Sequence, residues 1–521
     1  MAFNYIRGDR DQLFLMPVSM REWLDEGHLA WFVIDVVAKI DTSAFHARHP
    51  NDGPGRPAHD PDMMLALLLY AYGSGLRSSR RIEWACRTDA AHRVICGGVR
   101  PDHATIARFV VDHEAAIEAA FVDVLRLCAA AGLVSVGTIA IDGTKIAADA
   151  AIDANRGVGW LRAEVARIVA EAVSTDAAED AQGALFGGDR LPEGLSSAAG
   201  RRARLEAALA HVEAEDAAAR AEADERAARA RAAAEEGHKL KGRKPADPHA
   251  ALARAEADHA AVVARAEARA ADRAAREQAA AAEGHKLIGR KPSPDDGVGR
   301  SAAAVEAARA AAQAAGPAPD PAPAQANITD PDSRIMKTKD GFVQGYNCQA
   351  AVNEHQIVVA WAVTQEANDV HQYQPMVTAT VAALDAAGVT DQIGVVLADA
   401  GYWSEDNATV EGPERLIATQ KDWRQRRAAR DLGTTSGPPP EGASTLEAME
   451  HTLRTPEGAA SYKTRSHTVE PVFADTKENR GFRRFRRRGL AAVTSEWALM
   501  TTAHNLGKLF RHHTTAGLAV T

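Results

Sequence analysis

Three carboxylates stand at points of the sequence where a metal site could be built. Asp142 follows the apolar run 139–141, and Asp399 follows the apolar run 393–398. Each run is typical of a buried strand that presents its Asp at its tip. Glu470 lies in a segment with helical character. Carboxylate oxygens suit Mg²⁺, so three that converge would hold metal ions and support phosphodiester cleavage. Taken alone, an Asp after a strand is more often a turn or cap residue.

The stretch "YKTRSHTVEPVFADTKENRGFRRFRRR" (462–488) surrounds Glu470 with positive charge. It holds nine Lys or Arg against three acids, although the whole chain has a formal net charge of −9. Lys477 follows Glu470 by two helical turns, so a helix would carry both on one face. The carboxylate could then hold a metal while the ammonium contacts a phosphate. A solvated surface helix of mixed charge is the alternative.

Composition describes a globular protein of several domains. The 521 residues are 46% hydrophobic and 25% charged, and this length predicts two to four domains. The four cysteines lack metal-binding or disulfide spacing, which fits a reducing compartment. The start has no signal-peptide core, and no apolar run is long enough to span a membrane. We therefore expect a cytoplasmic protein.

The two ends of the chain differ in predicted structure. Residues 1–132 read as helices with a break at Gly73 and Gly75, which permits a helix-turn-helix DNA reader. Most short helical bundles do not read DNA. Later segments predict strands over 345–369, around a turn at Asn353, and over 414–420. The block 462–512 predicts helix.

An Ala/Arg/Glu-rich segment, 152–326, separates the first strand from the rest. It repeats "EGHKLKGRKP" (236–245) as "EGHKLIGRKP" (283–292), and it ends in a Pro-rich linker. A solvated helical hairpin or coiled-coil arm is favoured over an arm that contacts DNA.

In combination these segments resemble the DDE transposases of bacterial insertion sequences. The resemblance is to the group with a Tyr-Arg-Glu-Lys signature around its last carboxylate. "IAIDGTKIAA" resembles the first-Asp strand of that family, "LADAGYWSEDN" its second, and 462–489 its third-carboxylate helix. "GRPAHDPDMMLALLLYAYGSGLRSSRRIE" and "RPDHATIARF" resemble its leading helical domain. The resemblance covers 1–150 and 327–512.

The resemblance implies an α/β fold with an RNase H-like mixed-sheet catalytic core over 133–151 and 327–512. It also implies a helical N-terminal DNA-binding domain over 1–132. The helical insertion, 152–326, would follow the first core strand, and a shorter one, 421–460, would lie within the core. Better-known relatives carry the large insertion between the second Asp and the Glu, so no hairpin-forming step is carried over from them.

The resemblance also implies site residues. Asp142, Asp399 and Glu470 match the metal-binding triad, which would hold two Mg²⁺ or Mn²⁺ ions. Glu478 competes as the third acid, but it would point about 100° away from Lys477 on a helix. Four residues separate Arg465 from Glu470, one more than in the strict signature. The expected DNA contacts are Tyr462, Arg465, Lys477, Arg480, Arg483, Arg484, Arg486, Arg487 and Arg488.

Aromatic residues near the site have two interpretations each. Trp403 is a candidate for stacking on a flipped base, with a packing role favoured. Phe482 and Phe485 are favoured as core anchors over base-stacking platforms.

The implied function is a transposase. Hydrolysis at an element end would free a 3′-OH, which would then attack target DNA. Its partners would be double-stranded DNA, at terminal inverted repeats and target, and a second copy of the chain in a homodimer. One rival is a metal-dependent nuclease of the same fold. The other is a non-catalytic DNA-binding or scaffold protein whose helical arm drives self-association.

Overall fold

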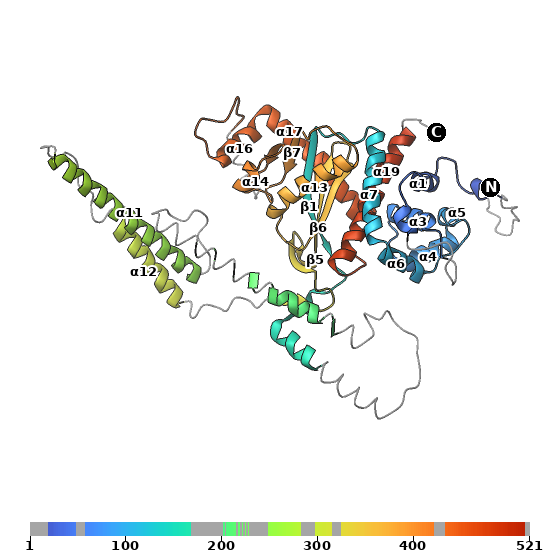
Figure 1. Ribbon diagram of the computed structural model, residues 1–521, viewed down its shortest axis with the longest axis horizontal. Coiled ribbons are helices and arrows are strands. Elements are labelled where there is room, and N and C mark those ends of the chain that lie inside the picture. The colour runs from blue at the N-terminus through green and yellow to red at the C-terminus, as the bar shows by residue number, and fades with distance from the viewer. Residues whose placement is uncertain are drawn as a thin grey trace, which may run out of the picture. The chain divides into compact units, whose positions relative to one another are not determined.

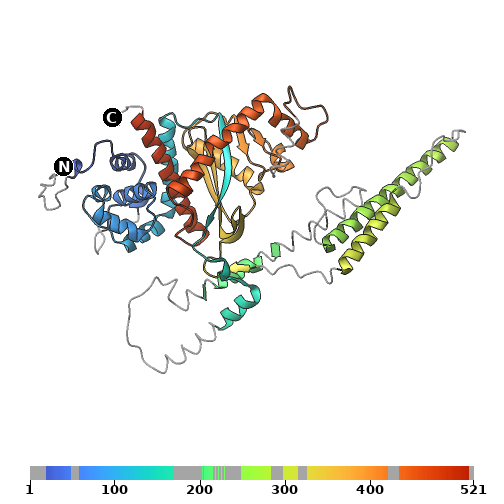
Figure 2. The same ribbon diagram turned by 180° about the vertical axis from the view of Figure 1, so that it is seen from behind.

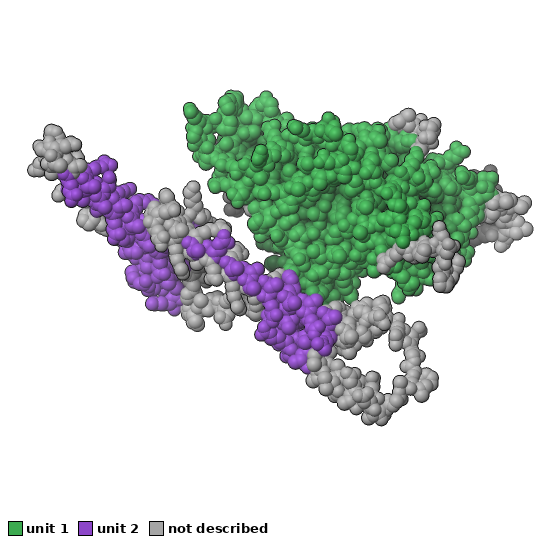
Figure 3. Space-filling model, viewed as in Figure 1, with its two compact units in different colours: residues 1–155, 327–521 green, residues 156–326 purple. Residues whose placement is uncertain are grey.

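The structure is a computed structural model that describes residues 19–47, 58–167, parts of 202–228, 248–282, 297–314, 325–420 and 433–515. The chain divides into two compact units (Figure 3), one made of 1–155 with 327–521 and the other of 156–326. In the described part of the chain, no helix has the length and apolar character needed to cross a membrane.

A mixed sheet forms the centre of the first unit. Strand β1 (Thr138–Ala147) pairs antiparallel with β5 (Gly341–Asn353) and parallel with β7 (Val395–Ala398). Beyond β7 lies β8 (Glu414–Ile417), also parallel, while β4 (Arg334–Thr338) and β6 (Val358–Thr364) both pair antiparallel with β5. A separate two-stranded sheet joins β2 (Asn155–Gly157) to β3 (Gln325–Asn327).

Three strand predictions can be compared with this sheet. The turn at Asn353 is confirmed: it joins β5 to β6, and its side chain accepts hydrogen bonds from the backbone of His355 and Ile357. Asp399 does follow β7 directly. Asp142 was wrongly placed at a strand tip. It lies inside β1, because pairing with β5 continues through the Gly143 position to Ala147.

Helices make up the N-terminal part of this unit, as predicted. Helix α4 begins after Ser78, and α6 begins after Asp102, whose carboxylate accepts a hydrogen bond from the backbone of Thr105 (2.7 Å). The helices are α1 (Leu29–Val37), α2 (Ser43–His46), α3 (Pro61–Gly73), α4 (Ser79–Thr88), α5 (Ala90–Ile95), α6 (His103–Asp112) and α7 (Glu114–Ala130).

Helix α19 (Leu490–Thr515) joins these helices to the sheet. It packs against α3 and α7 on one side and against β6 on the other (Figures 1 and 2). Asn505 on α19 bonds both backbone groups of Val358 in β6, at 2.9 and 2.8 Å. The N-terminal helices and the sheet therefore share one hydrophobic core.

The remaining helices follow the strands. They are α13 (Tyr373–Ala386), α14 (Glu405–Thr409), α16 (Thr445–Arg454), α17 (Pro456–Thr468) and α18 (Glu470–Ala474), with a π-helical turn over Asp475–Asn479. Helix α17 contacts β1 and β7, so it lies over the two central strands.

The predicted continuous helix over 462–512 is wrong for 480–489. Helical structure ends at Asn479, and the following residues form an irregular segment up to α19. Gly481 and Gly489 bound this segment with φ of +63° and +87°, a conformation that interrupts a right-handed helix. Phe482 and Phe485 turn into the core and are fully buried, as predicted.

A buried ion pair fixes the irregular segment. Glu496 on α19 is fully buried, and its carboxylate accepts hydrogen bonds from the backbone N–H groups of Arg486 and Arg487. Arg77, just before α4, lies 3.7 Å from Glu496 and donates to the backbone carbonyls of Gly481 and Arg484, both at 2.7 Å. The N-terminal helices thus hold the segment that follows the third predicted carboxylate.

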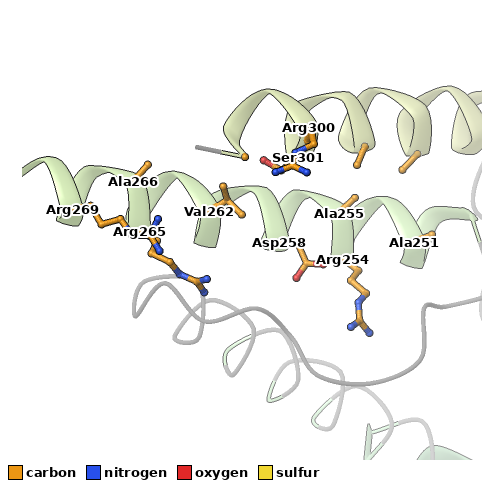
Figure 4. Close-up of a pocket in the computed structure, with 13 residues that line it drawn as sticks. Ala251, Arg254, Ala255, Asp258, Val262, Arg265, Ala266, Arg269, Arg300 and Ser301 are labelled. Carbon is orange, nitrogen blue, oxygen red and sulfur yellow. The ribbon is translucent and has the colours of Figure 1, made fainter. Parts of the chain in front are cut away.

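The second unit contains a helical hairpin, as the Ala/Arg/Glu composition predicted. Helix α11 (Pro248–Ala282) lies beside α12 (Val298–Ala314). A hydrogen bond of 2.9 Å joins His259 to Ser301. A cavity of about 670 Å³ is lined by residues of both helices, mainly alanines and arginines (Figure 4). The two repeated "EGHKL" turns, 236–245 and 283–292, lie outside the described residues.

Replacing Arg77 tests the buried pair. Arg77→Met leaves the Glu496 carboxylate buried without its cation, which costs about 3–5 kcal/mol. We expect a clear fall in the midpoint of thermal unfolding, followed by circular dichroism. Arg126→Met removes an Arg that is 54% exposed and paired with Asp123, so its loss should stay within about 1 kcal/mol. Equal effects of the two changes would contradict a structural role for Arg77.

Candidate active site

The first two predicted carboxylates lie side by side on the central strands. Ile141 of β1 and Ala398 of β7 are partners in the parallel register, so Asp142 and Asp399 follow them at neighbouring positions. The Asp399 carboxylate accepts a hydrogen bond from the backbone of Gly401 (2.7 Å), which holds it at the end of β7. The sheet register therefore brings the two residues together although 256 residues separate them in the chain.

Arg465 on α17 links the first carboxylate to the third. Its Nη2 donates to Asp142 Oδ2 at 2.6 Å, and its Nη1 lies 3.5 Å from Glu470 Oε1. Arg465 and Asp142 are 13% and 17% exposed, whereas Glu470 is 57% exposed. The guanidinium therefore lies between a buried carboxylate and one that faces solvent.

The electrostatics of Asp142 reflect a crowded acidic site. Burial raises the pKa of the Asp142 carboxyl to about 6. Arg465 opposes that shift, while the nearby carboxylates of Asp399 and Asp369 add to it. A cation at this point would favour the ionised form, and Arg465 is the cation that the protein itself supplies.

Asp369 is a site residue that the sequence reasoning missed. Its carboxylate accepts hydrogen bonds from Asn347 (2.7 Å) and Gln349 (2.8 Å) on β5, and both of its oxygens lie 3.1 Å from Lys145 Nζ on β1. The signal was weak, because Asp369 comes five residues after the end of β6, whereas Asp399 follows β7 directly. In the sequence, Asp369 lies at the end of the predicted strand segment 345–369, and no role was predicted for it.

Two glycines allow the carboxylates to lie so close to the backbone. A Cβ at Gly143 would lie 2.5 Å from Asp369 Oδ1, and one at Gly401 would lie 2.9 Å from Asp399 Oδ1. Both separations are shorter than normal contacts, so any side chain at these positions would displace the acids. The Gly after each Asp in "IDG" and "ADAG" thus has a steric function.

Tyr402 supports the same cluster of carboxylates through Gln349. It is fully buried, and its hydroxyl donates to Gln349 Oε1, the residue whose amide holds Asp369. Trp403 is half-buried and packs against the core, which agrees with the packing interpretation. Its stacking on a base stays a prediction.

Tyr462 and Lys477, two residues of the predicted signature, lie on α17 and on the π-helical turn. Tyr462 is half-buried and packs against the core, close enough to Arg465 for an electrostatic interaction. Lys477 Nζ donates to the backbone carbonyl of Lys145 at 3.2 Å, and burial lowers the pKa of its ammonium. Lys477 is thus held against β1, the strand that carries Asp142.

The arginines of 480–488 differ in their exposure. Arg480 is buried, and its Nε donates to Asp475 at 2.9 Å, so its predicted DNA contact is withdrawn in favour of a structural role. Others form ion pairs at the surface: Arg483 with Glu478, Arg487 with Glu114, and Arg488 with Asp149. Arg484 and Arg486 are exposed.

The three predicted ligands do not converge on one point as they stand. Among described residues, one set of three His, Cys, Asp or Glu side chains has ligand atoms within 4.8 Å of each other, and it is His46, Asp60 and Asp62 on the N-terminal helices. That set is largely exposed. In the candidate site the Arg465 guanidinium stands between Asp142 and Glu470, so a metal there would have to displace it.

Neighbouring carboxylates on the central strands of an α/β sheet, beside a basic segment, form a type of site found in enzymes that act on nucleic acids. Two family comparisons define it further. Residues 438–510 match the family described as "Transposase DDE domain", and residues 18–112 match the family described as "Transposase domain (DUF772)". These two matches support a DDE-type transposase of an insertion sequence. No curated protein and no solved structure matches the chain.

The two matches cover different parts of the chain. The DDE-domain match includes Arg465, Glu470 and Lys477, and the other match includes α3, α4 and α6. Neither reaches Asp142, Asp369 or Asp399. The family implies DNA binding and the use of divalent metal, while the residues of the two strands are placed by geometry alone.

Asp475 gives the protein a predictable response to acid. The hydrogen bond with His504 (3.3 Å), with Arg480 and Asn479, holds the pKa of the Asp475 carboxyl well below its usual range, although burial opposes this. A depressed pKa stabilises the fold above about pH 4, where the unfolded chain is ionised, and this contribution is lost as pH falls toward the folded pKa. Asp475→Asn should therefore destabilise the protein at pH 7.

Thermal unfolding at several pH values measures this effect. The stability gap between wild type and Asp475→Asn should shrink by about 1 kcal/mol between pH 7 and pH 3. Glu457→Gln, a change in the first turn of α17, is the control and should show no such trend. A gap that stays constant with pH would show that the Asp475 carboxylate is not held in its ionised form by the fold.

Proposed function

We propose that this transposase cuts DNA at the ends of its insertion sequence and joins the freed 3′ ends to target DNA at the carboxylate site. Asp142, Asp399 and Glu470 hold two divalent ions, Mg²⁺ or Mn²⁺. The core is an RNase H-like fold. The strand order β6–β5–β1–β7–β8 supports this, because β5 alone runs against β1 while β7 and β8 run with it.

One observation carries the proposal: a carboxylate on β1 shares a cationic partner with a second acid and lies beside a third at the end of β7. Asp142 and Asp399 are neighbours by register, and Arg465 reaches from Asp142 to Glu470. Acids from β1 and the start of α18 thus contact one positive group, and the acid at the end of β7 is close enough to raise the pKa of that group. A structural salt bridge needs one acid, whereas this arrangement supplies an excess of negative charge.

The residues present fit divalent metal. The donors are carboxylate oxygens, and burial, together with the nearby carboxylates of Asp399 and Asp369, raises the pKa of Asp142 although Arg465 opposes the shift, so an added cation would favour its ionised form. When bound, two ions would activate the attacking oxygen and stabilise the leaving oxygen. Asp142, Asp399 and Glu470 would be the residues that hold these ions.

The chain's own cations would then face the DNA. Arg465, displaced from Asp142, stays next to Glu470 and is placed to bind a phosphate of the cleaved strand. Lys477, held beside β1, offers a second charge at the same edge. Both steps exchange one P–O bond for another: water first displaces a 3′ oxygen, and that 3′ oxygen later displaces the 3′ oxygen of a target strand.

The cycle implies partners beyond the single chain. Pairing two element ends needs two active sites, so we propose that the protein acts as a homodimer on double-stranded DNA. Terminal inverted repeats and target DNA are the substrates, and the bacterial cytoplasm is where they are found. A nuclease of the same fold would make the first cut and fail to join the strands.

Cleavage of end-containing DNA tests the triad. Purified protein with Mg²⁺ or Mn²⁺ should cut a duplex that carries the DNA flanking the coding region. Asp399→Asn should lower the cleavage rate on the order of 10³-fold, because the charge at the reacting phosphate is no longer balanced. Glu470→Gln should do the same, while both variants still bind DNA.

Asp406→Asn is the matched control, since Asp406 is an exposed acid on α14, a short distance along the chain from Asp399. It should cut at the wild-type rate. Cleavage that survives in Asp399→Asn and Glu470→Gln would refute the metal site. Cutting without joining to a target plasmid would select the nuclease.

The role of Asp369 can be separated from that of the triad. Asp369→Asn removes the carboxylate that holds Lys145 on β1, the strand that carries Asp142, so cleavage should fall by about 10- to 100-fold. Raising the Mn²⁺ concentration should recover part of that loss, because the triad itself is intact. An unchanged rate at limiting metal would show that Asp369 does not position the site.

A further inference from the structure

The described surface of the N-terminal helices carries an exposed tryptophan among arginines. Trp84 on α4 is 65% exposed, which is unusual for a residue of its size. Arg80, Arg81 and Arg87 are exposed on the same helix, at spacings of three and four residues from Trp84. The opposite face of α4 carries Ile82, Ala85 and Cys86, all buried in the core. The outer face of α4 is therefore not needed for folding.

The acid on this helix does not neutralise the outer face. Glu83 accepts hydrogen bonds from the backbone and the ring of His103 at the start of α6, at 3.1 and 2.7 Å, and also pairs with Arg87. Its carboxylate thus braces α4 against α6. Arg80 and Arg81 extend their charges beyond it.

A shallow cavity of about 590 Å³ lies beside Trp84. Arg80, Arg81, Thr88 and His92 are among its lining residues. An exposed indole in a hollow that Arg80 and Arg81 line, with Asp89 as the one acid of the lining and apolar side chains between, suits a ligand that combines negative charge with flat or apolar edges.

The position of α4 points to the same ligand. Arg77, just before the helix, donates to the carbonyls of Gly481 and Arg484. A Cβ at Gly75 would lie 3.3 Å from the carbonyl oxygen of Arg480, so this turn lies directly on the irregular segment. Helix α4 therefore starts where the exposed Arg484 and Arg486 are held, within the same compact unit as Asp142.

We propose that the outer face of α4 is a binding site for duplex DNA next to the cleaved end. Arg80 and Arg81 contact backbone phosphates, and Trp84 contacts sugar and base edges in a groove. The inference rests on the proposed function, because it assumes that the DNA end reaches the carboxylate site of the same core. This inference assigns the sequence-dependent part of DNA binding to α4 and the cleavage and joining reactions to the carboxylate site on the strands.

Binding without cleavage tests this assignment. The full chain would be titrated, in buffer with a chelator, against a fluorescent duplex of the flanking DNA and against a scrambled duplex. For Arg80→Gln/Arg81→Gln we expect weaker binding to both duplexes. Its log–log salt slope between about 50 and 200 mM should be smaller by about 2, since two phosphate contacts are lost. For Trp84→Ala we expect the preference for the flanking duplex to fall by about 10-fold or more, with little change in slope.

Arg126→Gln is the matched control. Arg126 on α7 is 54% exposed and paired with an acid three residues earlier. It therefore resembles the arginines of α4 in exposure, since Arg87 on that helix is 55% exposed and paired with Glu83. The control should bind both duplexes as wild type does. Circular dichroism and thermal midpoints would establish that all variants are folded, which is expected because the replaced side chains lie at the surface.

The outcomes separate this inference from the proposed function. If the α4 variants bind like Arg126→Gln while wild-type protein cuts the ends, the α4 site is refuted and the catalytic proposal stands. If α4 variants lose binding but wild type never cuts, the α4 site stands and the catalytic proposal falls. A fall in self-association on Trp84→Ala, measured by sedimentation with DNA binding unchanged, would assign the face to a second copy of the chain and overturn the inference.

Discussion

Repulsion between carboxylates is the constraint on which the rest of the site depends. The sheet register sets Asp142 beside Asp399, and Asp369 approaches both across Gly143 and Gly401. Such a group of like charges, partly removed from water, is unstable unless cations balance it. The protein supplies Arg465 and Lys145, one from α17 and one from β1 itself. The packing of α17 over the central strands follows from this need as much as from its apolar contacts.

Lys145 and Arg465 are held differently, and we assign a supporting role to the first and a functional role to the second. Lys145 contacts both oxygens of Asp369, which also accepts hydrogen bonds from two side chains of β5, so this pair is locked into the sheet. Arg465 is anchored at Asp142 but only loosely associated with the exposed Glu470. Arg465 therefore links the buried part of the site to its exposed edge, whereas Lys145 balances charge within the sheet that carries the acids.

The sequence was sufficient for elements with local signals. Apolar runs located β5, β6 and β7, and the turn at Asn353 is held by its own side chain, which accepts hydrogen bonds from the backbone of His355 and Ile357. The sequence was not sufficient where distant residues decide. Nothing near Gly143 shows that β5 will extend β1 beyond Asp142, and nothing in 480–489 shows that Glu496 and Arg77 will capture its backbone. Asp369 was missed because its partners come from other strands.

The arginine-rich segment shows why charge counting alone misleads. Its composition indicated a DNA-binding helix, yet Arg480 is buried against Asp475, and Arg483, Arg487 and Arg488 pair with acids of the same unit. Much of that charge therefore serves the fold, joining α7, β1 and α19 around the site. Because Arg77 ties the same segment to the start of α4, a DNA end bound along α4 would be placed relative to Asp142 by a continuous, buried set of contacts. Recognition and cleavage would then take place on one compact unit with a shared hydrophobic core.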